Sequence, residues 1–108
     1  MDNEGTRSWE PACPAGDVGW SRPKGLTLRG IPVAIYNVDD TLYATHDVCT
    51  HAYALLSDGF QEGHVIECPL HGALYDVRDG KCMAVGACDL QTYRVKVEDG
   101  QVLVELPA

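Results

Sequence analysis

The sequence has few positive charges and no long apolar run. It contains 8 Lys and Arg residues against 16 Asp and Glu residues, which gives a formal net charge of −8. This excess of negative charge disfavours binding to nucleic-acid phosphates or to an anionic membrane surface. No apolar run approaches the roughly 18 residues of a membrane span, and the polar segment 1–8 lacks the apolar core of a secretory signal. We therefore expect a soluble protein of the cytoplasm.

The sequence also lacks common enzyme motifs and helical periodicity. It has no Walker loop, no Gly-x-Gly-x-x-Gly and no Gly-x-Ser-x-Gly, so the usual nucleotide and acyl-transfer sites are not indicated. No stretch keeps apolar residues at i, i+3, i+4 and i+7, and the only short helical turn expected lies near Asp58. At 108 residues we expect a single domain, 1–108, without room for a second, catalytic domain.

Alternating and β-branched segments predict strands instead. The candidate strands are 26–28, 31–38, 42–45, 64–67, 73–77, 93–97 and 102–104. Asp39-Asp40 and Asp99-Gly100 are typical of turns, and Pro32 indicates an edge position or the beginning of a strand. Residues 1–8 offer nothing apolar and are expected to be loosely attached. The pattern predicts an all-β fold, an antiparallel barrel or sandwich with an inserted small lobe of about residues 46–86.

Two Cys-His pairs stand near the middle of the chain. Cys49-Thr50-His51 is followed, after sixteen residues, by Cys68-Pro69-Leu70-His71. Two thiols and two imidazoles make four ligands, the number that closes a tetrahedral site or holds a two-iron cluster. A single Cys or His is more often a core or surface residue than a ligand. Two mixed pairs that bracket one loop indicate a metal site.

Other interpretations of these residues stay open. His46, Cys49, His64 and Cys68 also form a four-ligand set, although His46 and His64 lie in segments typical of strands. Zinc accepts two Cys and two His as readily as an iron cluster does. A mononuclear iron site would need His46 and His64 beside a carboxylate, in a chain without a second domain to hold them.

Five cysteines are an odd number, which argues against a disulfide framework. Cys13, Cys82 and Cys88 remain after the two candidate ligands. Cys82 and Cys88 are a possible redox pair, but there is no Cys-x-x-Cys motif. We therefore favour buried free thiols for these three residues.

The two pairs, together with Leu56-Ser57-Asp58-Gly59 and Ile66-Glu67 before Cys68, resemble the Rieske [2Fe–2S] family. The nearest likeness is to the small Rieske ferredoxins of bacterial ring-hydroxylating dioxygenases. The resemblance implies the same fold, with one [2Fe–2S] cluster in the inserted lobe. It implies that Cys49 and Cys68 bind one iron and that His51 and His71 bind the other.

The resemblance also implies a one-electron carrier that is not itself an enzyme. The donor would be a flavin-containing NAD(P)H-dependent ferredoxin reductase, and the acceptor a terminal aromatic-ring-hydroxylating oxygenase. The tip that carries His51, Ala52, Tyr53 and His71 would be the exit for electrons. A Rieske-like or zinc-binding small subunit of a larger reductase complex is the alternative, whereas nothing supports a stand-alone enzyme.

The sequence departs from the family pattern in its loops. Ala52 stands where relatives often have Gly, and Val85-Gly86-Ala87 stands where many have a Pro in a third loop, at about 82–92. Ala54 and Leu70 replace the cysteines that join the two ligand loops in respiratory Rieske proteins. The missing cysteines favour the ferredoxin type.

Ala73 and Tyr75 are the positions expected to tune the reduction potential. They match a Ser and a Tyr whose hydroxyls donate to a cluster sulfur and to a ligand cysteine in high-potential relatives. Ala73 cannot donate, while Tyr75 either donates toward Cys49 or only fills the core. We expect an intermediate-to-low potential.

Overall fold

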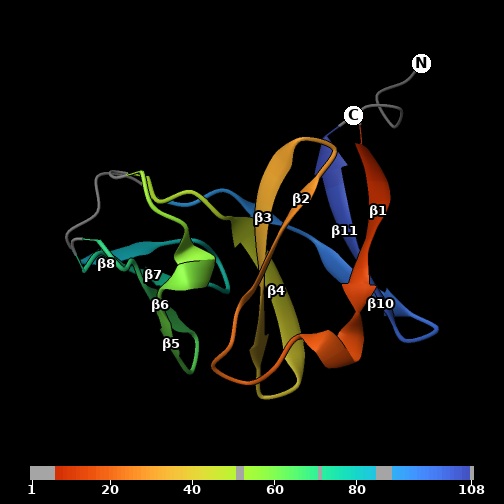
Figure 1. Cartoon of the computed structure of the whole chain (residues 1–108), viewed down its shortest axis with the longest axis horizontal. Helices are drawn as coiled ribbons and strands as arrows, with labels where there is room; N and C mark the ends of the chain where they lie inside the picture. The colour runs from red at the N-terminus through yellow and green to blue at the C-terminus, as the bar shows by residue number, and fades with distance from the viewer. Residues whose placement is uncertain (1–6, 51–52, 71, 85–88, 108) are drawn as a thin grey trace.

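The computed structural model describes residues 7–50, 53–70, 72–84 and 89–107. Three sheets, in the orders β1-β11-β10, β2-β3-β4-β9 and β5-β6-β7-β8, make up this part of the chain (Figure 1). Neighbouring strands within these sheets are antiparallel, which confirms the predicted all-β fold. The strands are β1 (Arg7–Pro14), β2 (Lys24–Leu28), β3 (Ile31–Val38), β4 (Thr41–His46), β5 (Phe60–Glu62), β6 (Val65–Glu67), β7 (Leu74–Asp76), β8 (Cys82–Ala84), β9 (Thr92–Tyr93), β10 (Val95–Glu98) and β11 (Gln101–Pro107).

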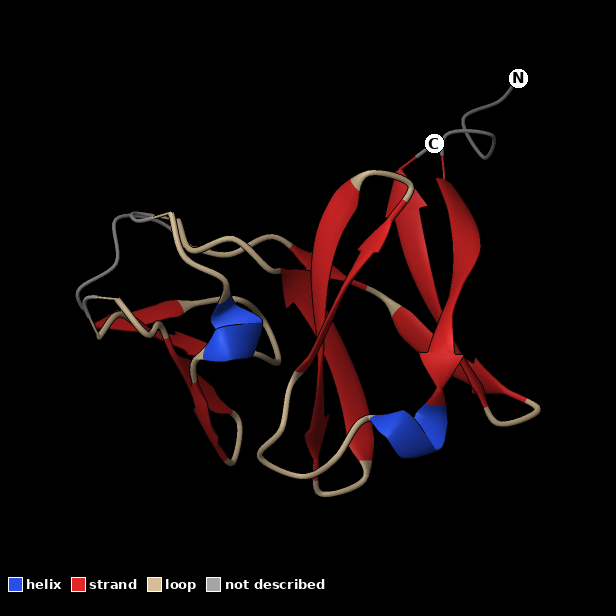
Figure 2. Ribbon diagram, viewed as in Figure 1, coloured by secondary structure: helices blue, strands red, loops and turns tan. Residues whose placement is uncertain are grey.

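Helical structure is limited to two short 3-10 turns among the described residues (Figure 2). These are η2 (Ala15–Asp17) and η3 (Leu56–Asp58), and the second confirms the turn predicted near Asp58. Neither turn has the length and apolar character that a membrane crossing would need.

Two-residue turns join neighbouring strands. Arg29-Gly30 connects β2 to β3, Asp39-Asp40 connects β3 to β4, and Asp99-Gly100 connects β10 to β11. Both residues of each turn have positive φ. This is the type I′ conformation, whose twist matches that of the flanking strands. The turns predicted at 39–40 and 99–100 are confirmed.

Strand β3 is buried on both faces. Successive side chains of a strand point to opposite sides, so alternate residues of β3 enter different cores. Val33 and Ile35 pack against β11, whereas Ala34 and Tyr36 pack against the segment that follows β4. Figure 1 shows β3 between strands β1 and β11 on one side and the β5–β8 sheet on the other.

The segment between β4 and β9, residues 47–91, builds the β5-β6-β7-β8 sheet and is called the lobe below. The two other sheets are called the base. The chain returns to the base at β9, where Tyr93 and Thr92 pair with Ala44 and Thr45 of β4. The lobe is thus inserted between two neighbouring strands of the base, as the predicted fold class requires.

One expectation about strands was wrong in part. The run 93–97 is not one strand, because β9 pairs with β4 while β10 pairs with β11. The chain changes sheets at Arg94. The expectation for Pro32 is confirmed in one of its two forms, since Pro32 lies at the beginning of β3, which is a central strand of its sheet.

The expectation that residues 1–8 are loosely attached was wrong for at least the last two of them. Arg7 and Ser8 belong to β1 and pair with Pro107 and Leu106 of β11. Because β11 extends this far, it supplies backbone partners that the composition of 1–8 does not reveal. Residues 1–6 lie outside the described residues.

Candidate metal centre

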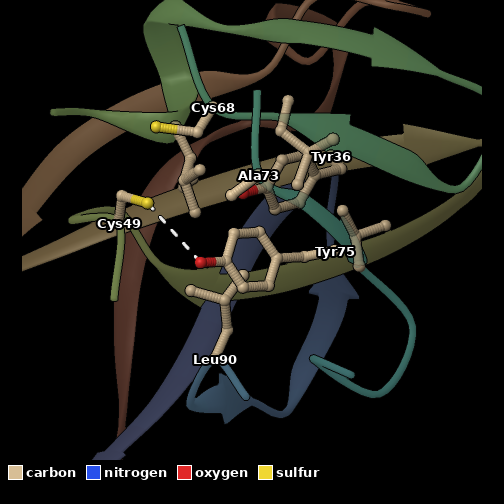
Figure 3. Packing of buried hydrophobic residues seen from close by; sticks show 10 residues of the cluster. Tyr36, Cys49, Cys68, Ala73, Tyr75 and Leu90 are labelled. Carbon is tan, nitrogen blue, oxygen red and sulfur yellow. Dashed lines mark hydrogen bonds between the residues drawn. The ribbon is translucent and has the colours of Figure 1, made fainter. Parts of the chain in front are cut away.

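Cys49 and Cys68 are buried neighbours in the lobe. Cys49 is 5% exposed and Cys68 is 1% exposed, and both belong to the core that contains Tyr36 and Tyr75. Figure 3 shows both sulfur atoms on the same side of this core. The structure therefore brings two of the four predicted ligands together. The other two, His51 and His71, lie outside the described residues.

Backbone hydrogen bonds close the loop that begins at Cys49. The Cys49 N–H donates to the Ala54 carbonyl at 2.9 Å, and Val48 and Leu55 form a β-bridge just outside this bond. The Leu56 N–H donates to the Asp47 carbonyl at 2.7 Å. The ends of the first loop are thus fixed before the loop reaches Thr50.

A buried carboxylate holds this first loop together beside β2 of the base. Asp47 is 3% exposed, and its two carboxylate oxygens accept hydrogen bonds from the Ser57 N–H at 2.8 Å and the Ser57 hydroxyl at 2.7 Å. Gly25 of β2 lies against this pair, and a Cβ there would come within 2.9 Å of Asp47 Oδ2. The sequence analysis did not single out Asp47 or Gly25, because their contact joins two distant segments.

The second loop is the connection between β6 and β7. Glu67 pairs with Leu74, and the Cys68 N–H donates to the Ala73 carbonyl at 2.8 Å. Gly72 has a φ of +75°, a conformation that a residue with a side chain rarely adopts. Pro69 and Leu70 are exposed at the tip.

Tyr75 lies beneath Cys49 and is fully buried. Its hydroxyl oxygen is 3.5 Å from Cys49 Sγ and 2.6 Å from Thr50 Oγ1 (Figure 3 shows the first contact). Burial raises the pKa of Tyr75 to about 12, with Cys49 adding to the rise and Thr50 opposing it. The phenol therefore keeps its proton at neutral pH and can donate it. Sequence reasoning identified Tyr75 but missed Thr50, since nothing in the pattern shows that Thr50 faces a strand 25 residues away.

Burial also raises the pKa of the Cys68 thiol. The backbone N–H of Leu70 opposes this rise, and the neighbouring Cys49 adds to it. A thiol must lose its proton to bind a metal, so loading of this site releases protons.

The alternative ligand sets are wrong. His46 Nδ1 lies 3.2 Å from the Tyr93 hydroxyl, and His64 Nε2 lies 3.9 Å from Asp76 Oδ2. Asp76 is already held by Arg78, whose side-chain hydrogen bonds lower the pKa of this carboxyl. Among the described residues, which include all of His46, Cys49, His64 and Cys68, no three His, Cys, Asp or Glu side chains gather closely enough to hold a metal ion. Among these residues, no carboxylate completes a mononuclear site with His46 and His64.

Of the remaining cysteines, Cys13 lies in the base, whereas Cys82 packs against the lobe core that contains Cys49 and Cys68. Cys13 is a buried free thiol in the core of the base, as expected. Cys82, on β8, pairs with Tyr75 of β7 and is free, but it is only partly buried, so the expectation that it is buried was wrong. Cys88 and the segment Val85-Gly86-Ala87 lie outside the described residues, so pairing of Cys82 with Cys88 stays a hypothesis.

Apolar side chains are exposed beside the two ligand loops. Tyr53 is 96% exposed, and Leu55 and Leu70 are about half exposed. A shallow groove of about 420 Å³ lies here, lined by Val48, Tyr53, Ala54, Leu55, Asp58 and Pro69. Exposed apolar residues that gather in one place are typical of protein interaction sites.

Comparisons with known proteins agree with this geometry. The family model described as the Rieske [2Fe-2S] domain matches residues 8–94. The ferredoxin component of the naphthalene 1,2-dioxygenase/salicylate 5-hydroxylase systems of Ralstonia sp is 38% identical over 102 residues, which cover 94% of this chain and 98% of the relative. The Sphingomonas yanoikuyae B1 ferredoxin superposes with a TM-score of 0.84 at 34% identity, covering 93% of this chain and 100% of that one.

A chain from a complex is also similar. In a structure of reduced oxygenase with oxidized ferredoxin in carbazole 1,9a-dioxygenase, one chain matches with a TM-score of 0.84 at 38% identity. The match covers 89% of this chain and 91% of that chain.

Proposed function

Because the chain belongs to the Rieske [2Fe–2S] family, we propose that it carries single electrons to a terminal aromatic-ring-hydroxylating oxygenase. It contains one Rieske-type [2Fe–2S] cluster and is an electron-transfer component rather than a catalytic enzyme. The observation that carries the proposal is the end-to-end match, over 94% of this chain and 98% of the relative, with a ferredoxin component of dioxygenase systems.

The residues present fit such a cluster. We propose that Cys49 and Cys68 hold one iron and that His51 and His71 hold the other, following the Rieske pattern. When bound, the cluster supplies a site that takes up and releases one electron. Burial of Cys49 and Cys68 at 5% and 1% exposure keeps water from the two thiols. Two loops whose ends are fixed by backbone hydrogen bonds hold the sulfur atoms in place.

The partners and the setting follow from the same premise. We propose a flavin-containing NAD(P)H-dependent reductase as donor, the terminal oxygenase as acceptor, and the cytoplasm as location. We also propose that residues 1–108 form one domain, with a cluster-binding lobe of about 46–86. The net charge of −8 would favour encounters with basic surfaces on the partners.

A spectrum of the purified protein tests the proposal. We expect visible absorption, an electron-spin resonance signal after reduction, and two irons per chain. We also expect reduction by a ferredoxin reductase with NAD(P)H, followed by electron delivery to an oxygenase. A colourless protein that contains zinc would contradict the proposal and favour a zinc-binding subunit of a larger complex.

The exposed tip is the proposed docking surface for these partners. Tyr53→Ala should slow reductase-coupled transfer while leaving the spectrum unchanged, because Tyr53 is 96% exposed and makes little packing contact. Phe60→Ala is the matched control, since Phe60 is also an exposed aromatic residue, at 68%, but lies on β5. Transfer that is insensitive both to ionic strength and to Tyr53→Ala would place docking elsewhere.

A further inference from the structure

The Tyr75 hydroxyl lies between two possible partners. Its oxygen is 2.6 Å from Thr50 Oγ1 and 3.5 Å from Cys49 Sγ. A phenol has one proton, so it donates to one partner at a time, while its oxygen can accept from another donor. Two arrangements are therefore available. Either Thr50 donates to Tyr75 and Tyr75 donates to Cys49, or Tyr75 gives its only proton to Thr50.

The chemistry of the sulfur decides between them. A cysteine that ligates a metal is a thiolate, which has no proton and can only accept. Tyr75 is fully buried, so no bulk water competes for its proton. Only the arrangement in which Thr50 donates gives the negative sulfur a hydrogen bond from Tyr75. That arrangement also makes Tyr75 a stronger donor, because hydrogen bonds in a chain polarise one another.

A second Tyr-Thr pair in the same core shows how the terminal acceptor sets the direction. The Tyr36 hydroxyl lies 2.9 Å from Thr45 Oγ1, and Thr45 donates to the His46 carbonyl at 3.0 Å. Since the proton of Thr45 goes to that carbonyl, Tyr36 must donate to Thr45. At Thr50 and Tyr75 an acceptor, Cys49 Sγ, lies on the tyrosine side, which favours the opposite direction.

Building on the ligand role proposed for Cys49, we propose that Thr50 is a positioning residue for the reduction potential. Its hydroxyl donates to the Tyr75 oxygen and so directs the Tyr75 proton toward Cys49 Sγ. Hydrogen bonds to the sulfur atoms favour the reduced, more negative state, so Thr50 raises the potential through Tyr75. Thr50 suits this role, because a β-branched side chain has restricted rotamers.

The midpoint potentials of four variants, measured by protein-film voltammetry, test this inference. The visible absorption of each variant checks that its cluster content is unchanged. Thr50→Val removes the hydroxyl and should lower the midpoint, by less than Tyr75→Phe does. Thr50→Ser keeps the hydroxyl and should stay close to the natural protein. Thr50→Val combined with Tyr75→Phe should match Tyr75→Phe alone, because the effect of Thr50 passes through the phenol.

Several results would overturn the inference. A midpoint that rises in Thr50→Val would mean that Thr50 competes with Cys49 for the phenol proton. An unchanged midpoint, or an effect that persists in full in the Tyr75→Phe background, would also refute it. Thr45→Val is the matched control and should not move the midpoint, since Thr45 bonds Tyr36 and the His46 carbonyl.

Two further comparisons keep the test decisive. If Thr50→Val does not retain iron, Thr50→Ala and Thr50→Ser serve instead, because both lack the methyl group and differ only in the hydroxyl. A natural protein without a Rieske spectrum would refute the proposed function itself. An intact spectrum with an insensitive midpoint would refute only the role of Thr50.

Discussion

The cores of the base and the lobe differ in composition and in the regularity of the strands around them. The base core is mainly aliphatic and is covered by long strands such as β1, with 8 residues, and β11, with 7. The lobe core contains Tyr36, Tyr75, Cys49 and Cys68, and its sheet has strands of only 3 residues each. Burial of apolar surface is sufficient to explain the base, whereas the lobe combines burial with specific polar contacts.

Those polar contacts lie around the first ligand loop. The Asp47-Ser57 and Thr50-Tyr75 pairs join residues of the lobe, and the Tyr36-Thr45 pair joins β3 and β4 of the base beneath it. Such networks fix orientation rather than add much stability, because each bond replaces bonds to water. The difference teaches that specific polar positioning is concentrated in the lobe, while apolar burial is the main feature of the base core.

Loss of the cluster should have the largest effect and should affect the lobe selectively. Cys68→Ser removes a proposed ligand, and binding of a metal site contributes directly to folding, so we expect several kcal/mol less stability in the lobe. Hydrogen exchange should show lost protection at the amides of Cys49 and Cys68 while β3 and β11 stay protected. Cys13→Ser, a buried thiol of the base, is the control and should keep the visible spectrum. Equal loss of protection in both parts would contradict the selective effect on the lobe.

A matched pair of leucines compares the two cores directly. Leu106 in the base and Leu56 in the lobe are both 0% exposed. Truncation of a buried leucine to alanine costs about 2–5 kcal/mol, so both variants should unfold at lower urea concentration. Only Leu56→Ala should change the visible spectrum or the retention of iron, because Leu56 follows the first ligand loop. A spectral change in Leu106→Ala would show that the base also positions the cluster.

Ser57→Ala should have a smaller effect. It removes the 2.7 Å hydrogen bond to Asp47 and leaves a buried carboxylate with one donor fewer, at a cost of about 1–3 kcal/mol. Urea unfolding followed by circular dichroism measures this loss. Asp58→Ala, at the next and exposed position, should stay within about 0.5 kcal/mol. If the two variants were equally stable, the Asp47-Ser57 contact would not anchor the loop.

The smallest expected effect is the most specific to electron transfer. Tyr75→Phe should lower the midpoint potential by roughly 40 mV, since a hydrogen bond of ~1 kcal/mol to Cys49 Sγ favours the reduced form. Ala73→Ser should raise the midpoint by introducing a donor. Tyr36→Phe is the control, because Tyr36 is equally buried but bonds Thr45. An unchanged midpoint in Tyr75→Phe would reduce Tyr75 to a packing role.

Local signals in the sequence were sufficient for much of the fold, and they singled out Cys49 and Cys68, which the structure places in one core. Asp39-Asp40 and Asp99-Gly100 mark turns whose geometry depends mainly on the residues within them. The Cys-His pairs are recognisable from their spacing in the sequence alone. Strand β1 was missed because Pro11 and Pro14 demote a strand in sequence reasoning, while β11 supplies the pairing. The three-residue strands β5 and β8 were missed because such short runs have no readable period.

The side-chain contacts of the site were harder to predict than its ligands. Thr50 reaches Tyr75, and Asp47 reaches both Ser57 and Gly25, only after the register of several strands is set. A contact of this kind depends on the pairing of several strands. The spacing of residues in a motif therefore does not predict it.

Strand β3 contributes residues to both cores, and its register determines which of them face the electron-carrying site. A slip of one residue would exchange its two faces, turning Val33 and Ile35 toward the ligand loops and Tyr36 toward the aliphatic core. The tight turns Arg29-Gly30 and Asp39-Asp40 hold β3 in place from both ends. Neither turn belongs to the lobe, yet an error in either one would misassemble the surroundings of Cys49. Correct assembly of the redox site therefore depends on two hairpin turns of the base.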